Sequence, residues 1–136
     1  MPKTIFVDSN VFLRFFTVDD AGQHARAAQL FEKAAAGRLN LITGPPVLFE
    51  IAWTLRAAYD QPRERVLDVL AAIQALSSLA LTDALLVEQA IELARKSGQE
   101  YADAYIVAAA QKAGASEIAT FNQKHFDKLG AKLHGF

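Results

Sequence analysis

The spacing of apolar positions changes several times along the chain, and each change predicts a new secondary-structure element. Short runs rich in aliphatic and β-branched residues alternate with longer segments whose apolar residues recur at helical spacing. The predicted strands are residues 4–7, 39–43, 79–82 and 117–121, with an edge strand near Leu133. The predicted helices are residues 10–16, 22–37, 45–59, 62–78, 83–96 and 102–112, with a short helical stretch at 123–128.

Prolines, glycines and one acid indicate where several of these elements begin and end. Pro45 and Pro46 follow Gly44, and proline is tolerated in the first turn of a helix. Asp83 is a candidate N-cap of its helix, and Gly98 closes that helix.

Strands that alternate with helices of ten or more residues indicate parallel strands joined by crossover helices. We therefore expect an α/β fold, namely a three-layer α/β/α sandwich whose central parallel sheet has four to five strands. Ligands of such sheets bind outside the carboxyl ends of the strands. Asp8, Thr43 and Asn122 lie at the ends of three predicted strands, so we expect them on one rim.

The composition narrows the class of protein. With 136 residues, 52% of them hydrophobic, the chain is expected to form a single domain over residues 1–136. The absence of cysteine excludes disulfides, thiolate nucleophiles and sulfur-ligated zinc, so a metal would bind through oxygen or histidine. Without a signal-peptide core or an apolar run of about 20 residues, we expect a cytoplasmic protein with no membrane segment. The formal net charge of −1 means that a polyanionic substrate would need a local basic patch.

Three acids, Asp8, Glu50 and Asp103, are each the only charged residue in a long apolar neighbourhood. Helical spacing places Glu50 on one face with Trp53, and Asp103 on one face with Ile106, and we expect both faces to point at protein. An unpaired carboxylate removed from water costs several kcal/mol, so such groups are paired, protonated or bound to a cation. Three carboxylates that converge on one rim would need a divalent cation between them, and hard oxygen ligands suit Mg²⁺ or Mn²⁺.

A structural role is also open for each acid taken singly. Asp8 is a candidate cap of the helix that begins near Asn10, Asp103 fits the first turn of its helix, and Glu50 has Arg56 as a possible ion-pair partner. The basic residues close to these acids in sequence are few, which favours a shared metal-binding role for the three together.

Four segments resemble the motifs of PIN-domain proteins, in particular the VapC-type toxin ribonucleases of toxin–antitoxin pairs. They are "FVDSNVFLRFFTVDD", "VLFEIAWTL", "YADAYIVAAAQKAG" and "IATFNQKHFDKL", in the family's order and over nearly the whole chain. The resemblance implies a PIN-like fold and a metal-dependent endoribonuclease in which Asp8, Glu50 and Asp103 hold Mg²⁺ or Mn²⁺, with Asn10 nearby. It also implies a homodimer and a small VapB-like antitoxin partner.

The fourth acidic position of the family falls at Asn122, where many relatives carry an acid. An amide oxygen still ligates a metal or orients a water, but it adds no negative charge, so this departure bears on a second metal. Glu100 is an alternative ligand because it lies three residues before Asp103. Thr120 ends the fourth predicted strand, and its hydroxyl is a candidate for positioning a phosphate or a ligand water.

Other functional interpretations rest on single residues. Ser9 is disfavoured as a nucleophile because no histidine is placed locally to activate it. A phosphomonoesterase with an aspartyl nucleophile would need an acid at position 10, where the chain has Asn10, so this function is disfavoured. Asn122 motivates a different alternative, a PIN-like module that only binds RNA or protein. The three histidines lack metal-ligand spacing and are expected to be solvated or to cap helices. The candidates for holding the RNA backbone are Arg14, Arg26, Arg56 and Lys124.

Overall fold

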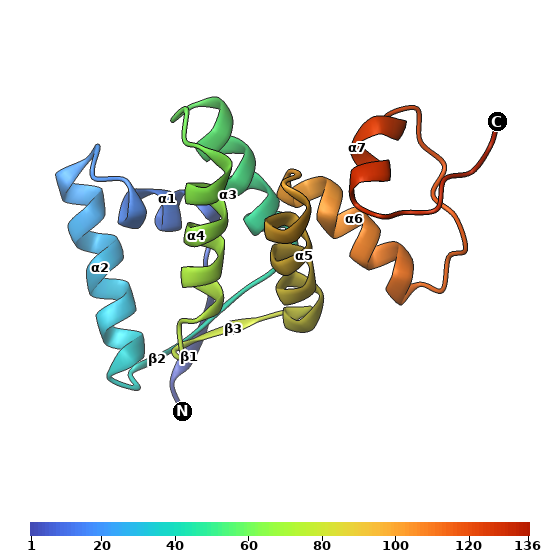
Figure 1. Ribbon diagram of the computed structural model, residues 1–136. Coiled ribbons are helices and arrows are strands. Elements are labelled where there is room, and N and C mark those ends of the chain that lie inside the picture. Colours follow the sequence, from blue (N-terminus) through green and yellow to red (C-terminus); the bar gives the residue numbers. More distant parts are fainter.

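The structure described here is a computed structural model that covers residues 1–136. It contains three short strands and seven helices. In chain order they are β1 (Lys3–Phe6), α1 (Ser9–Phe16), α2 (Ala21–Ala35), β2 (Leu39–Thr43), α3 (Pro45–Ala57), α4 (Arg63–Gln74), β3 (Leu79–Leu81), α5 (Ala84–Ser97), α6 (Tyr101–Lys112) and α7 (Gln123–Lys128) (Figure 1).

The three strands form one parallel sheet in the order β1-β2-β3. Ile5 lies opposite Leu41, and Leu41 lies opposite Leu79. Two helices connect each strand to the next, as expected for parallel strands that need a crossover. The predicted α/β class with a parallel sheet is confirmed, but the predicted number of four to five strands is wrong.

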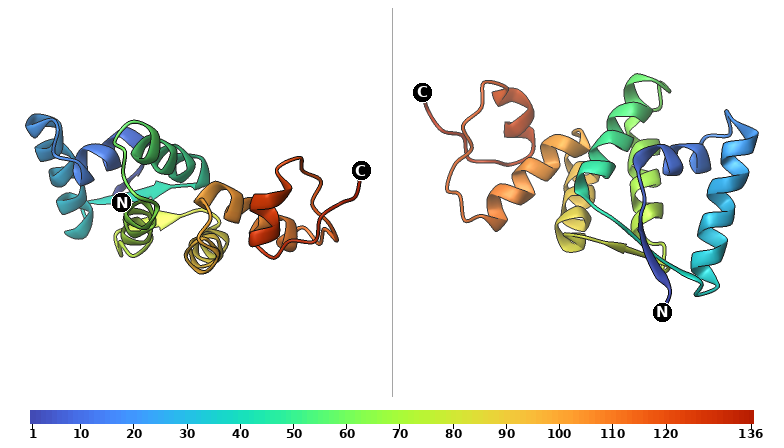
Figure 2. Two further views of the ribbon diagram at one scale, coloured as in Figure 1. Left: turned by 45° about the horizontal axis from the view of Figure 1, so that its top comes forward. Right: turned by 180° about the vertical axis from the view of Figure 1, so that it is seen from behind.

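The two missing strands are residues 117–121 and the segment near Leu133. Ile118 forms a single parallel bridge with Leu133, in which the Ile118 amide donates to the Lys132 carbonyl at 2.8 Å and the His134 amide donates to the Ile118 carbonyl at 2.9 Å. Both views in Figure 2 show this segment standing away from β1 to β3. A strand needs a neighbouring strand to accept its hydrogen bonds, and here only the end of the chain is within reach.

One face of the sheet carries the hydrophobic core and the other is largely uncovered. Val7, Leu41 and Leu79 are buried against the helices. On the opposite face Phe6 is 60% exposed and Ala80 is also exposed. Parallel sheets are usually covered on both faces, so the predicted third layer is incomplete over these residues. The outer edge of β1 has no neighbouring strand either.

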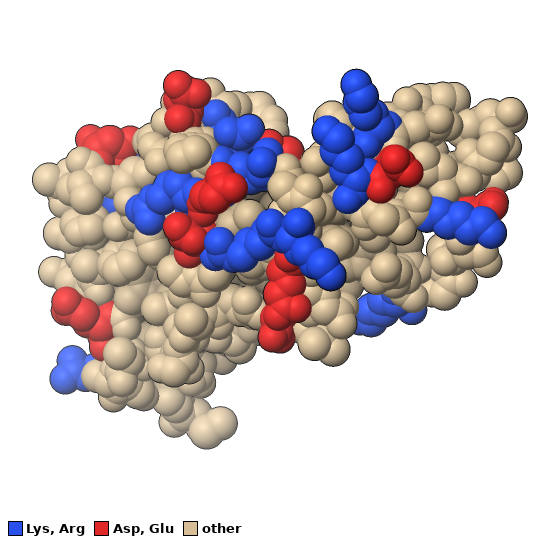
Figure 3. Space-filling view, in the orientation of Figure 1, with Lys and Arg blue, Asp and Glu red and all other residues tan.

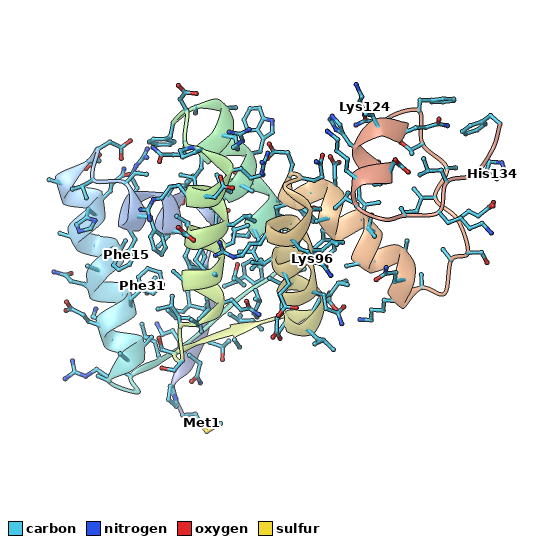
Figure 4. The ribbon with its side chains drawn as sticks, in the orientation of Figure 1. Met1, Phe15, Phe31, Lys96, Lys124 and His134 are labelled. Carbon is cyan, nitrogen blue, oxygen red and sulfur yellow. The ribbon has the colours of Figure 1, made fainter.

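Aromatic packing and one glycine position the helices that follow β1 and β2. Phe15 of α1 and Phe31 of α2 point toward each other in Figure 4, with ring centroids 4.9 Å apart. Gly44 precedes α3, and a Cβ at this position would lie only 2.6 Å from the Thr82 hydroxyl oxygen. The absence of a side chain at position 44 therefore lets α3 begin directly against the end of β3.

Residues 101–136, called the C-terminal arm below, extend away from the sheet beside α5 (Figure 1). Helix α6 packs along α5 and touches α3, and α7 packs on α6. Tyr101 anchors the root of the arm: its ring lies 5.5 Å from that of Phe49, and burial raises the pKa of its hydroxyl, which has no hydrogen-bond partner. No helix of the molecule combines the length and the apolar content needed to cross a membrane.

Candidate active site

Asp8 lies just after β1, at the carboxyl end of the sheet, and caps α1. Its backbone is extended, and its Oδ1 accepts a hydrogen bond from the Ser9 amide at 2.8 Å. The capping role left open by the sequence is therefore what the structure shows. It leaves Oδ2 without a protein partner, so the cap does not exclude a ligand role for the same carboxylate.

Ser9 connects Asp8 to Glu50, which lies 41 residues further along the chain than Ser9. The Ser9 side chain is almost fully buried, and its hydroxyl donates to Glu50 Oε1 at 2.8 Å. Neither Asp8 nor Glu50 forms an ion pair with a Lys, Arg or His. Two uncompensated carboxylates are thus fixed side by side. Sequence reasoning missed this bridging role of Ser9, because no local pattern signals a hydrogen bond between distant residues.

Glu50 and Trp53 lie on the outer face of α3, so the prediction that this face points at protein was wrong. Glu50 is exposed, and Trp53 is 69% exposed. The inward face of α3 is instead formed by Leu48, Ile51 and Leu55, which are almost completely buried. Helix α3 is apolar on more than one side, and hydrophobic periodicity alone did not distinguish its two faces.

Arg56 pairs with Glu100 rather than with Glu50. Its Nη2 donates to Glu100 Oε1 at 2.8 Å, and the guanidinium of Arg63 lies 3.9 Å from the same oxygen. Glu100 is therefore neutralised by two cations. This gives it an ion-pairing role, in contrast to the uncompensated Asp8 and Glu50.

Asp103 lies in the first turn of α6, as expected, and is partly buried. Its Oδ2 is 3.6 Å from Nδ1 of His125, a distance that makes an ion pair when the imidazole is protonated. The side-chain amide of Asn122 lies 2.9 Å from the same nitrogen. The role of His125 as the link between Asp103 and Asn122 was not predicted.

The predicted site residues therefore fall into two groups. The N-terminal half of the site consists of Asp8, Ser9 and Glu50, and the C-terminal half consists of Asp103, Asn122 and His125. No three acidic or histidine side chains lie close enough to hold one metal ion together. The structure thus joins Asp8 to Glu50 but does not bring Asp103 into the same cluster.

The predicted rim is formed in part. The Thr43 hydroxyl donates to the Val7 carbonyl at 2.9 Å, so Thr43 and Asp8 share the carboxyl edge of the sheet. Asn122 lies instead on the arm, where its backbone amide donates to the Thr120 hydroxyl at 3.0 Å. The expectation that Asn122 shares this edge fails because residues 117–121 do not join the sheet.

Arg14 is held in a polar network behind the N-terminal half. Its Nε donates to Gln23 at 2.7 Å, and its Nη1 donates to the Tyr59 hydroxyl at 3.0 Å and lies 3.3 Å from Asp19. The Tyr59 hydroxyl donates to Asp19 at 2.7 Å and lowers the pKa of that carboxyl. The guanidinium is thus fixed by three partners.

A cavity of about 350 Å³ opens between α1 and α2 on the side of Asn10. Arg14 and Arg26 line it, and Arg26 forms no ion pair with the protein. This cavity brings Asn10 and Arg14 into one depression beside α1.

The face seen in Figure 3 carries basic side chains near both halves of the site. Figure 3 shows Lys and Arg gathered over α3 and α7, on both sides of the hollow between them, with acidic side chains interleaved. Lys124 projects outward from α7 in Figure 4. The basic side chains on this face do not form a continuous patch, because acids lie between them and Arg56 and Arg63 share Glu100.

Comparison with protein-family models identifies a family for this chain. The sequence model of the PIN domain matches residues 5–132, a span that contains every residue of both halves of the site. A search of curated protein sequences returned no significant match.

Proposed function

The chain belongs to the PIN domain family, and we propose that it is an endoribonuclease that depends on Mg²⁺ or Mn²⁺. PIN domains are generally nucleases. The observation that carries the proposal is the pair of uncompensated carboxylates, Asp8 and Glu50, held together by Ser9 at the carboxyl end of the sheet. The helix cap accounts for Asp8 but not for Glu50. Neither carboxylate has a cationic partner, so an ion pair does not account for the pair either.

The donor atoms of this pair fit a hard divalent cation. Asp8 Oδ2 and Glu50 Oε2 make no protein hydrogen bond, and carboxylate oxygens are the ligands that Mg²⁺ and Mn²⁺ prefer. We propose that Asp8 and Glu50 hold the metal; Asp103 and Asn122, which the structure leaves in the separate C-terminal half, stay predicted ligands. A bound cation supplies Lewis-acid polarisation of the scissile phosphate and a water of lowered pKa.

The protein groups would orient the reactants. Ser9 fixes the rotamer of Glu50 through its hydroxyl, which leaves the other carboxylate oxygen free for the cation. Asn10 and Arg14 would contact the RNA from the cavity between α1 and α2, and Thr120 from the arm. No covalent enzyme intermediate is needed, in agreement with a Ser9 hydroxyl that is buried and already donating to a carboxylate.

The biological role that we propose is that of the toxin of a toxin–antitoxin pair. The four segments that resemble VapC-type ribonucleases support this role. By the same resemblance we propose a VapB-like antitoxin as partner, a homodimer and a cytoplasmic location.

The second candidate function is a PIN-like module that binds RNA or protein without cleaving it. Asn122 in place of an acid and the engagement of Asp103 by His125 favour this candidate. The two functions differ in metal binding. If the chain is the proposed nuclease, Mg²⁺ or Mn²⁺ should raise the melting temperature of the protein, because a ligand of the native state stabilises that state. EDTA should reverse the rise.

The nuclease proposal is tested with purified protein and total cellular RNA, with and without Mn²⁺, and with the new RNA ends mapped by sequencing. Asp8→Asn and Asp103→Asn should each reduce cleavage by more than about a hundredfold, because each removes a charge that the reaction uses. Asp127→Asn changes an exposed acid of the arm outside the site and should cleave like the unaltered protein. Full cleavage by the Asp8 variant would contradict the proposed site.

A further inference from the structure

Trp53 is the only tryptophan of the chain, and it is 69% exposed on α3. An indole gains free energy when it is removed from water, so an exposed one is available to a ligand that covers its face. Trp53 lies three residues after Glu50, and side chains at this spacing are neighbours on a helix, with Cβ atoms roughly 5–6 Å apart. The exposed ring is therefore adjacent to an acid of the proposed site.

The surroundings of Trp53 are ionic rather than apolar. It is the only large hydrophobic side chain exposed on α3. One turn beyond it is Arg56, which shares the Glu100 carboxylate with Arg63, so this group of three residues keeps one net positive charge. The outer face of α3 thus presents a carboxylate, an indole and a guanidinium on successive turns.

We propose that Trp53 is a stacking platform for a base of single-stranded RNA next to the cleaved phosphate. A nucleotide needs one free aromatic face and a nearby cation for its phosphate, and the outer face of α3 offers both. Stacking does not require a particular base, so Trp53 would set the position of the RNA rather than its sequence. This inference rests on the proposed ribonuclease function.

The lone tryptophan makes the test direct, because all tryptophan emission comes from position 53. The probe is a short single-stranded RNA, added to the Asp8→Asn protein so that it stays intact, with binding followed in parallel by anisotropy of labelled RNA. RNA should quench the emission of Trp53. The same RNA carrying one abasic site should bind with less quenching when the missing base is the stacked one, while abasic sites elsewhere have no effect.

Kinetics on the otherwise unaltered protein provide a second measurement. Trp53→Leu should raise KM about 5- to 150-fold with kcat little changed, because it removes binding shared by substrate and transition state. Trp53→Phe retains an aromatic face and should restore most of the affinity. Because Trp53 is exposed, all variants should keep the melting temperature of the parent protein, which serves as the control for folding.

The possible outcomes separate this inference from the proposed function. RNA that is bound and cleaved while Trp53 emission and the KM of Trp53→Leu stay unchanged overturns the stacking role alone. A shift of Trp53 emission that follows protein concentration without RNA assigns the ring to self-association, and a shift that follows only a protein ligand assigns it to a protein interface. Either result overturns the proposal. RNA that is neither bound nor cleaved overturns the stacking role and the ribonuclease function together.

Discussion

The two halves of the candidate site contain similar chemical groups but rest on very different supports. Asp8, Ser9 and Glu50 lie on elements whose neighbouring residues, such as Val7 and Ile51, are almost fully buried. Asp103 also begins on a packed helix, but Asn122 and His125 lie in a stretch of the arm that is largely exposed. Local opening of a protein costs least where few apolar contacts are buried. The N-terminal half is thus fixed by the global fold, whereas the C-terminal half is held by local contacts.

The largest expected effect tests this difference in support. Phe12→Ala, at a fully buried position of α1, the helix that carries Ser9, should lower the free energy of unfolding by about 3–5 kcal/mol because it leaves a cavity in the core. Phe126→Ala, at a buried position of the six-residue α7, should cost less, because an exposed arm relaxes around the lost ring. Urea denaturation of the two variants measures both values. Equal costs would show that the arm is as firmly integrated as the sheet.

A smaller effect is expected from the hydrogen bonds that connect each half. Ser9→Ala removes a buried donor to a carboxylate and should destabilise the protein by roughly 1–2 kcal/mol. His125→Ala removes a half-exposed partner of Asp103 and should cost less than about 0.5 kcal/mol. Thermal unfolding at neutral pH separates these values. If His125→Ala destabilises the protein as much as Ser9→Ala, the two halves of the site are equally well supported and the proposed difference is wrong.

The smallest effect concerns the surface network around Arg14, which lies behind the N-terminal half. Tyr59→Phe removes the hydrogen bond that lowers the pKa of Asp19, so that pKa should rise toward its ordinary value of 3.8. A carboxyl whose pKa is depressed by folding stabilises the protein above its unfolded pKa, and this contribution is lost as the pH falls through the folded value. The free energy of unfolding of the variant should therefore be lower than that of the parent near neutral pH, and the two values should converge in stronger acid.

Nuclear magnetic resonance titration of the Asp19 carboxyl measures this shift directly. Thr17→Val, which removes a weaker hydrogen bond to the same carboxyl, is the matched control and should move the pKa less. An Asp19 pKa that stays unchanged in Tyr59→Phe would show that the network does not persist in solution.

The local part of the fold could be predicted from the sequence. The strand at 39–43 and the helical stretch at 123–128 have the observed bounds, and the helix predicted at 102–112 begins one residue earlier, at Tyr101. Turn residues and hydrophobic spacing determine these elements over short distances. The segment 117–121 has the same β-rich character as 39–43, but a strand exists only when another strand pairs with it, and pairing is a long-range property.

The site shows the same division between local and long-range information. The isolation of Asp8, Glu50 and Asp103 among apolar residues predicted that all three converge, whereas the structure links Asp8 to Glu50 through Ser9 and leaves Asp103 apart. The bridge through Ser9, the outward orientation of Trp53 and the partner of Asp103 depend on which elements pack together, so the sequence pattern contained no signal for them. Composition indicated only that any metal would be bound by oxygen or histidine, and the carboxylate oxygens Asp8 Oδ2 and Glu50 Oε2 make no protein hydrogen bond.

The unpaired outer edge of β1 has a consequence for how copies of the protein meet. A free strand edge offers backbone donors and acceptors to any other extended chain, and a net charge of −1 provides little mutual repulsion. Here β1 is only four residues long, its first residue is the exposed Lys3, and the preceding Pro2 has no amide proton to offer. Resistance to edge-to-edge aggregation is therefore concentrated in two residues, which act as gatekeepers for the exposed Phe6 that follows them.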